Sequence, residues 1–114
     1  MLTVKEKGLL LSIKKHCERI QEKTAGISEE ELRQSEDTKE IVCFNLFQIG
    51  ELAKNLSMDF LAKHDKMPWK NIKGMRDRVA HGYGSIDLKE IWRTATNDIE
   101  PLRKYCEQIL LTDD

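Results

Sequence analysis

The chain has 114 residues and a net charge of −1, and 39% of its residues are hydrophobic. This length suits a single domain over residues 1–114, and the near-neutral balance excludes a protein drawn to RNA by its overall charge. No stretch reaches the about 20 apolar residues of a membrane span and the start lacks a signal-peptide pattern, so we expect a cytoplasmic protein without membrane contact. Three widely spaced cysteines predict neither disulfides nor a metal site, and we expect no cofactor.

The first half of the chain predicts two long helices joined by a short helical turn. Apolar residues recur at intervals of three and four at Leu10, Ile13, Cys17 and Ile20. This spacing predicts a helix over about residues 3–23. The capping box Ser-Glu-Glu-Glu at residues 28–31 predicts a short turn of helix. A second regular stripe comprises Val42, Leu46, Ile49, Ala53 and Leu56. It predicts a helix that starts near Ser35 or Asp37 and runs to about residue 56.

The second predicted helix is apolar on two sides. Phe44 and Phe47 lie on the side opposite the core stripe, near Gly50. In a chain this small, a second apolar side is better explained by a partner contact than by a larger core. We therefore predict that Phe44 and Phe47 line a homodimer interface, at which Gly50 lets backbones approach. Glu51 lies between the two sides, where it either pairs with a cation near the site or is solvated.

Two further helices are predicted before the glycine-rich connection at residues 82–85. Ser57 can cap a short helix that runs through residue 64. Pro68 suits the first position of the next helix, because proline has no backbone N–H to lose there and its φ is already helical. The apolar spacing that follows predicts a helix over about residues 68–81.

The chain ends in a long predicted helix. A capping box at residues 87–90 opens it, and its apolar stripe continues to about residue 111. Pro101 lies inside this helix, and its ring clashes with the carbonyl group four residues earlier, so we expect a kink or slip near residues 96–97. Four main helices with short connections predict an all-α fold, an up-down antiparallel four-helix bundle with short extra helical turns.

Residues 76–83 bring together an arginine, a histidine and a tyrosine. Arg76 offers a planar fork of donors that matches a phosphate and keeps its charge, and His81 can transfer protons near neutral pH. Such a pair can cleave RNA without metal, because the imidazole moves the protons and the guanidinium holds the developing negative charge. From the residues alone, it is at least as well supported that Arg76 pairs with a surface carboxylate and that His81 caps a helix.

The bases of the chain are concentrated around this motif. Residues 63–81 hold six Lys and Arg and two acids, whereas residues 28–40 hold six acids and two bases. A basic segment is what a phosphate-binding site requires, although a charge run is more often a solvated helix face. If the segment binds RNA, we expect Lys70, Lys73 and Arg78 to follow the RNA backbone.

The arrangement Arg76-x4-His81-x-Tyr83 resembles the motif of HepT-like toxins, which belong to the HEPN group of small helical ribonucleases. Three further segments match in the family's order, namely residues 49–54, 68–75 and 98–102. The resemblance implies a homodimeric, metal-independent endoribonuclease in which Arg76 and His81 are catalytic. It also implies a partner, a minimal nucleotidyltransferase antitoxin, that would modify Tyr83 with AMP.

Asp77 departs from the family pattern, in which an amide usually follows the arginine. A carboxylate at this position could weaken the attraction of Arg76 for phosphate, or could orient the arginine. The alternative function is therefore a non-catalytic helical adaptor, or a substrate subunit, that binds a nucleotidyltransferase or a nucleotide. In a substrate subunit Tyr83 keeps its importance, and Arg76 becomes dispensable.

Overall fold

Helices make up the regular structure of this chain. The computed structural model describes residues 1–79 and 87–113, and every regular element within these ranges is helical, which confirms the predicted all-α class there. The elements in chain order are α1 (Val4–Thr24), α2 (Glu29–Gln34), α3 (Glu36–Lys54), α4 (Met58–Lys63), α5 (Trp69–Lys73), α6 (Met75–Val79), α7 (Leu88–Arg93), the π-helical segment η2 (Thr94–Asp98) and α8 (Ile99–Thr112).

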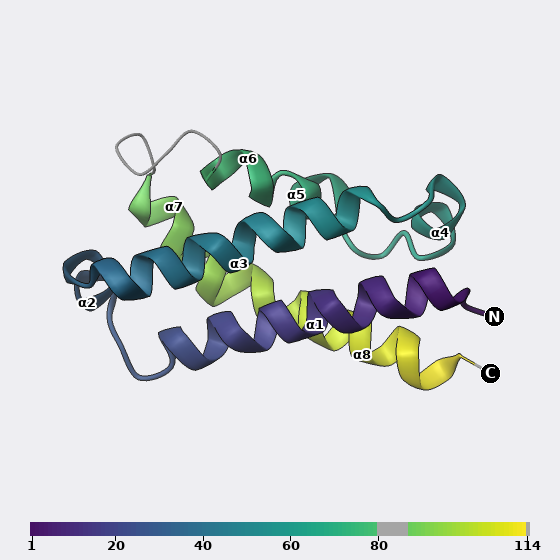
Figure 1. Ribbon diagram of the computed structural model, residues 1–114, viewed down its shortest axis with the longest axis horizontal. Helices are drawn as coiled ribbons and strands as arrows, with labels where there is room; N and C mark the ends of the chain where they lie inside the picture. Colours follow the sequence, from purple (N-terminus) through teal and green to yellow (C-terminus); the bar gives the residue numbers. More distant parts are fainter. Residues whose placement is uncertain (80–86, 114) are drawn as a thin grey trace.

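Three long helices, α1, α3 and α8, form the body of the molecule. α1 packs against α3 and α8, while α5 and α6 lie along α3 on its other side (Figure 1). α1 and α3 run in opposite directions, and α8 returns toward the end from which α1 started. This arrangement places α6, which carries Arg76, directly on α3.

The helices begin where the sequence supplies caps. Thr3 accepts a hydrogen bond from the N–H of Glu6, and the Glu6 carboxylate accepts one from the N–H of Thr3. Ser28 and Glu31 form the same reciprocal pair at the start of α2, which confirms the predicted capping box. Ser35 caps α3 through the N–H of its third residue. A cap of this kind contributes about 1 kcal/mol, which is a large part of what a helix as short as α2 needs.

The predicted apolar stripes form the core. The core-facing residues of α1 and α3 are at most 4% exposed, among them Leu10, Ile13, Cys17, Ile20, Val42, Leu46, Ile49 and Ala53. Burying one such aliphatic side chain contributes about 1.5–3 kcal/mol, so these two stripes account for much of the driving force. The other faces are mostly polar but include exposed apolar residues such as Leu11 and Phe44. None of the described helices is both long and apolar enough to cross a membrane.

The predicted helix over residues 68–81 is divided at Gly74. The N–H of Gly74 still donates to the carbonyl of Lys70, but the N–H of Asp77 donates to the carbonyl of Gly74, only three residues back. This tighter bonding turns the chain between α5 and α6. Glycine is a weak helix former, so the break falls at the residue where it costs least. The sequence therefore predicted the helical character of residues 69–79 but missed their division, and the predicted end of the helix at residues 80–81 lies outside the described residues.

The final helix changes register where Pro101 predicted a slip. Residues Thr94–Asp98 are π-helical, and α8 continues from Ile99 with the apolar stripe still facing the core. Proline at position 101 has no N–H to donate to residue 97, and its ring presses on that carbonyl, so the wider π-turn accommodates both. The slip predicted near residues 96–97 is confirmed. Thr94, the first residue of the π-helical segment, is completely buried.

Candidate active site

Gly50 allows α6 to lie against α3. A Cβ atom at position 50 would stand 2.5 Å from the backbone nitrogen of Arg76 and 2.7 Å from its Cβ. Real Cβ atoms essentially never come this close to other atoms, so only glycine permits the observed contact. The close approach that we expected Gly50 to allow is therefore made within one chain. It fixes the position of Arg76 on the surface of α3.

The guanidinium group of Arg76 is held by two carboxylates and an aromatic ring. Its Nε donates to Glu51 Oε1 at 2.9 Å, and its Nη1 lies 3.3 Å from Asp77 Oδ1. Its Cζ lies 5.5 Å from the centroid of the Phe47 ring, within the range of a cation–π contact. Of the two possibilities left open for Glu51, the structure shows pairing with a cation. Asp77 likewise contacts Arg76, but less closely.

These contacts orient Arg76 without removing it from solvent. The Arg76 side chain remains 38% exposed, and those of Glu51 and Asp77 are 41% and 68% exposed. Ion pairs exposed to this degree typically contribute only 0–1 kcal/mol. A phosphate could therefore replace the weaker carboxylate contact at little cost, while Glu51 continues to hold Nε. The geometry suits a group that is oriented in advance and still open to an anion.

Two of the predicted site residues, His81 and Tyr83, lie outside the described residues. Their proposed roles therefore stay predictions, and the described part of the site consists of Gly50, Glu51 and Phe47 on α3 with Arg76 and Asp77 on α6.

The three bases expected to follow RNA occupy different environments. Lys70 is exposed and Lys73 is partly exposed on α5, as an RNA contact requires. Arg78 instead turns inward, and its side chain is only 19% exposed. Its guanidinium nitrogens bind Asn71, Thr94 and Glu90 on three other elements. The partners of the Arg78 guanidinium are thus residues of the same chain, which favours a structural role for Arg78 over a phosphate contact.

The two phenylalanines predicted for a dimer interface also differ. Phe44 is 57% exposed, and its ring meets the edge of the His16 ring at a centroid distance of 6.5 Å. Phe47 is half-buried beneath the Arg76 guanidinium. Phe44 is therefore the side chain that is free to meet a partner, whereas Phe47 supports the site. Behind them the buried Asn45 accepts a hydrogen bond from His16, with 2.7 Å between Oδ1 and Nδ1.

Sequence reasoning missed the residues that bind Arg78. Asn71, Glu90 and Thr94 belong to α5, α7 and η2, and Thr94 is one of two buried polar residues in the described ranges. Glu90 and Thr94 belong to a different predicted helix from Arg78, so periodicity gives no signal for them. Asn71 lies seven residues before Arg78 within the predicted helix over residues 68–81, which is a helical spacing. A further hint is the position of Thr94 near the register slip predicted from Pro101.

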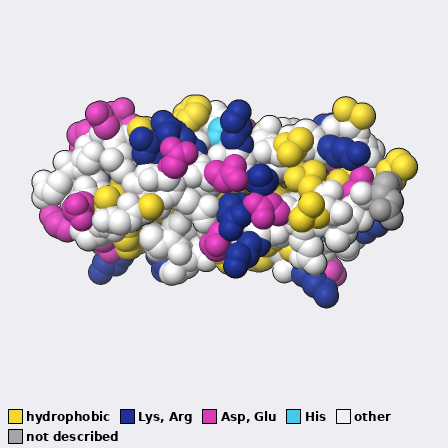
Figure 2. Space-filling view, turned by 90° about the horizontal axis from the view of Figure 1, so that it is seen from below, with side chains coloured by type: hydrophobic (Ala, Val, Ile, Leu, Met, Phe, Trp, Pro, Cys, Tyr) yellow, Lys and Arg dark blue, Asp and Glu magenta, His cyan; other side chains and the backbone are white. Residues whose placement is uncertain are grey.

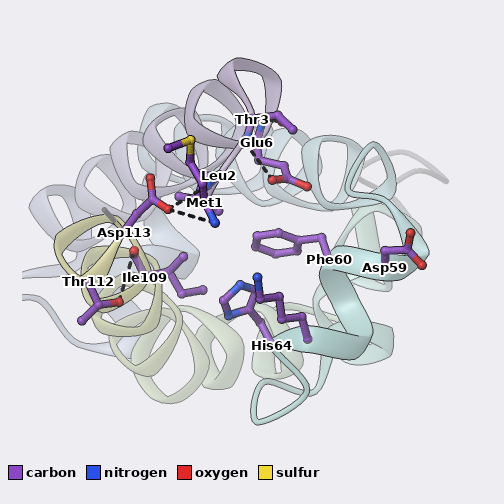
Figure 3. Close-up of a pocket in the computed structure, with 11 residues that line it drawn as sticks. Met1, Leu2, Thr3, Glu6, Asp59, Phe60, His64, Ile109, Thr112 and Asp113 are labelled. Carbon is purple, nitrogen blue, oxygen red and sulfur yellow. Dashed lines mark hydrogen bonds and ion pairs between the residues drawn. The ribbon is translucent and has the colours of Figure 1, made fainter.

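A hollow of about 440 Å³ lies at the opposite end of α3 from α2, among the start of α1, α4 and the end of α8 (Figure 3). Phe60 and His64 line one side of it in a tilted ring contact, with ring centroids 4.5 Å apart. Burial, and then the charge of Lys63, lower the pKa of His64, which disfavours the imidazolium there. None of the described residues predicted to act on RNA lines this hollow. The candidate site is therefore an open surface of α3 and α6.

Acidic and basic side chains are mixed on the face opposite the candidate site. The face on the α1–α8 side, seen from below in Figure 2, mixes acidic and basic side chains and has no continuous basic patch. A chain with a net charge of −1 offers RNA no general attraction. Phosphate binding at the candidate site is therefore expected to depend on nearby cations such as Arg76, Lys70 and Lys73, and not on the overall charge.

An all-helical chain with an oriented, solvent-accessible arginine on a paired-helix surface fits the class of small helical ribonucleases. A comparison with protein families supports this class, since the family described as Ribonuclease HepT-like matches residues 13–109. The chain belongs to the HepT-like ribonuclease family, as its motif residues predicted.

Several relatives carry ribonuclease names. A protein named "Putative RNase" from Caldanaerobacter subterraneus subsp. tengcongensis is 38% identical over 98 residues, which cover 86% of this chain and 88% of that protein. A "Probable ribonuclease HepT" from Thermococcus cleftensis is 33% identical over 103 residues, covering 90% and 94%. A "Putative RNase" from Methanocaldococcus jannaschii is 31% identical over 104 residues, covering 91% and 86%. No solved structure matches the chain.

Proposed function

We propose that this protein is a metal-independent endoribonuclease and the toxin of a bacterial or archaeal toxin–antitoxin pair. The observation that carries the proposal is the orientation of Arg76, held by Glu51 and Phe47 yet 38% exposed, in a chain of the HepT-like ribonuclease family. A guanidinium fixed in this way can hold two oxygens of a phosphate. In this proposal the α5–α6 segment is the third helix of the up-down four-helix bundle expected from the sequence.

The proposed reaction uses the RNA's own 2′-hydroxyl group. His81 takes the proton from this hydroxyl, whose oxygen attacks the neighbouring phosphorus. The bond from phosphorus to the 5′-oxygen breaks, and the protonated imidazole returns a proton to that oxygen. The products are a 2′,3′-cyclic phosphate and a 5′-hydroxyl, and no redox partner or metal is needed. Arg76 stabilises the negative charge that builds up on the phosphoryl oxygens in the transition state.

Asp77 and Glu51 take different parts in this proposal. Asp77 Oδ1 lies 3.3 Å from Arg76 Nη1, which is a long contact for a charged pair, and the carboxylate is largely exposed. We expect a bound phosphate to displace it. Glu51 accepts from Nε at 2.9 Å, on a different edge of the guanidinium, and can stay in place when phosphate binds. Glu51 then orients the arginine throughout the reaction.

The cleavage assay is direct. Purified protein is incubated with RNA in excess chelator, and the ends of the products are identified. We expect the parent to cleave, His81→Ala to be inactive, and Arg76→Lys to lose about 100-fold, because lysine cannot reproduce the fork. Arg33→Lys is the matched control, since Arg33 pairs with Glu29 on the surface of α2, outside the described site. Equal cleavage by the parent and His81→Ala would exclude His81 from the mechanism.

The dimer is a separate part of the proposal. Phe44 offers an exposed aromatic surface on α3, the helix that also carries Phe47 and Glu51. We propose that two copies pack through Phe44 and so form a groove between their arginines. Sedimentation should show a dimer for the parent and a monomer for Phe44→Glu. Leu11→Glu, at an equally exposed apolar residue on α1, should stay dimeric. A monomeric parent would refute the shared groove.

The partner is proposed to be a minimal nucleotidyltransferase antitoxin. The Tyr83 hydroxyl would attack the α-phosphorus of ATP bound to the antitoxin, losing its proton, and pyrophosphate would leave. Support comes from the family membership and from the position of Tyr83 two residues after His81. Mass spectrometry of the co-expressed protein should find AMP on Tyr83. Addition elsewhere, or none, would count against this assignment.

A second function, a non-catalytic adaptor that binds a nucleotidyltransferase, is favoured by one observation. Two carboxylates already satisfy the charge of Arg76, and carboxylates compete with phosphate. Expression of the chain alone in a bacterium distinguishes the two functions. A nuclease should arrest growth, and His81→Ala should relieve the arrest. An adaptor should leave growth unchanged in both cases.

A further inference from the structure

Arg78 joins three elements that the sequence separates. Its Nη1 donates to Thr94 Oγ1 at 3.0 Å, its Nη2 donates to Asn71 Oδ1, and its Nε lies 3.3 Å from Glu90 Oε1. Each nitrogen of the guanidinium therefore has a different partner, two through hydrogen bonds and one through an ion pair. These four residues, Arg78, Asn71, Glu90 and Thr94, are called the Arg78 clamp below.

The Arg78 clamp is built into the protein. Thr94 is completely buried, so its hydroxyl cannot reach RNA or solvent, and the Arg78 side chain is 19% exposed. Glu90 also pairs with Arg93 at 3.3 Å, and this second contact helps fix the carboxylate that receives Arg78. A guanidinium that is largely withdrawn from water and bound to three acceptors is costly to rearrange. Arg78 thus differs from the exposed Lys70, which has the same sign of charge.

The Arg78 clamp joins the end of α6 to the start of α7. Arg78 lies one residue before α6 ends at Val79, and Glu90 lies in the first turn of α7, whose cap is Asp87. Residues 80–86 connect these two points. The clamp therefore ties the last turn of α6, before this connection, to the helix after it. In the proposed function, His81 belongs to the connection, and Arg76 lies on the same short helix as Arg78.

We propose that Arg78 is a positioning residue for the candidate site and not a ligand of the RNA backbone. Through Asn71, Thr94 and Glu90 it fixes α6 against α5, α7 and η2, and so sets the position of Arg76, which lies on the same short helix. This inference rests on the proposed nuclease function for its effect on catalysis. The existence of the clamp concerns the fold alone, and it can be tested without measuring RNA cleavage.

Two substitutions separate positioning from phosphate binding. Arg78→Lys keeps the charge but cannot reach three acceptors at once. Thr94→Val is close in size and removes only the buried hydroxyl that receives Nη1. If Arg78 held a phosphate, Arg78→Lys would keep most of the cleavage activity, and Thr94→Val would cleave RNA at the parental rate. If Arg78 is a positioning residue, both variants should lower kcat by about tenfold or more and change KM by less than about threefold.

Thr96→Val is the matched control. Thr96 belongs to the same π-helical segment, but it is exposed, and its hydroxyl donates to the carbonyl of Trp92 instead of contacting the clamp. We expect its kcat and KM to match those of the parent. The double variant Arg78→Lys with Thr94→Val should lose little more than either single variant, because both remove the same interaction.

Hydrogen–deuterium exchange supplies the readout that does not depend on cleavage. In Thr94→Val, exchange should rise several-fold at residues 75–79 and 87–93, and in Thr96→Val it should stay at the parent level. Unchanged exchange in Thr94→Val would refute the clamp. Faster exchange with an unchanged kcat would refute positioning. If the parent fails to cleave RNA at all, the nuclease proposal and the positioning role fall together, and exchange alone decides whether the clamp exists.

Discussion

For Gly50→Ala the structure predicts a modest loss of stability together with a much larger loss of cleavage activity. The added methyl group would lie 2.5 Å from the backbone nitrogen of Arg76 and 2.7 Å from its Cβ, where ordinary contacts are 3.4–4 Å. The atoms that it meets belong to the start of the Arg76 side chain and to the backbone, so no flexible tip can move aside. The helix α6 must therefore shift by about 1 Å away from α3.

The two consequences of this shift differ in size. Overpacking of this kind costs about 1–3 kcal/mol, and the better helix propensity of alanine returns up to about 1 kcal/mol within α3. The protein should therefore fold with a modestly lower melting temperature. Cleavage is more sensitive, because a misplacement of about 1 Å at a catalytic group can cost about 100-fold. Arg76 would also lose its 2.9 Å contact with Glu51, since that geometry depends on the position of α6.

The assay compares Gly50→Ala with Gly8→Ala. Gly8 lies within α1, and a Cβ added there meets no atom within 4 Å. Gly8→Ala should keep parental cleavage and gain up to about 1 kcal/mol of stability from the same exchange of residues. Circular dichroism melting and initial cleavage rates are measured for both variants. A folded Gly50→Ala that cleaves RNA at the parental rate would show that the α3–α6 contact does not position Arg76 for the reaction.

Three further predictions concern Glu51, Glu100 and the cysteines. Glu51→Ala should lower kcat about tenfold, while Glu51→Gln, which keeps the acceptor for Arg76 Nε, should lower it less; steady-state kinetics distinguish them. Hydrogen bonds from Gln21 and Arg103 lower the pKa of Glu100, so the stabilisation that it gives is present above its unfolded pKa and is lost as the pH falls through its folded pKa. Melting temperatures of the parent and Glu100→Gln should therefore differ most near neutral pH and converge in acid. Burial raises the pKa of Cys43 to about 11 and raises those of Cys17 and Cys106, so a thiol reagent near pH 8 should label the native protein slowly and the unfolded protein at once.

The parts of the fold that the sequence predicted follow local rules. The stripe from Leu10 to Ile20 and the caps at Ser28 and Ser57 depend on residues three or four positions apart, and all of them are confirmed. The slip before Pro101 is equally local, because proline acts on the carbonyl four residues earlier. Such signals can be read without knowing what a helix packs against.

The parts that the sequence could not predict depend on contacts between distant residues. Arg76 meets Gly50 across 26 positions, and nothing in either neighbourhood indicates the pairing. Arg78 and Lys70 look alike in a charge count, yet one turns inward to Thr94 and the other stays exposed. Charge in a sequence has a sign but no direction, so the sequence placed Arg78 among the surface bases although its side chain turns inward. The RNA contacts expected of Lys70 and Lys73 stay predictions.

The short helix α6 explains why these distant contacts matter for function. Five residues cannot form a stable helix alone, because nucleation costs more than one turn of hydrogen bonds returns. Arg76 and Arg78 are two residues apart, about 200° around the helix, so they point to opposite sides. One is fixed against α3 by Gly50 and Glu51, and the other is fixed by the Arg78 clamp. The helix that carries the candidate catalytic arginine therefore owes its position to tertiary contacts on both sides, and loosening either side moves the same guanidinium.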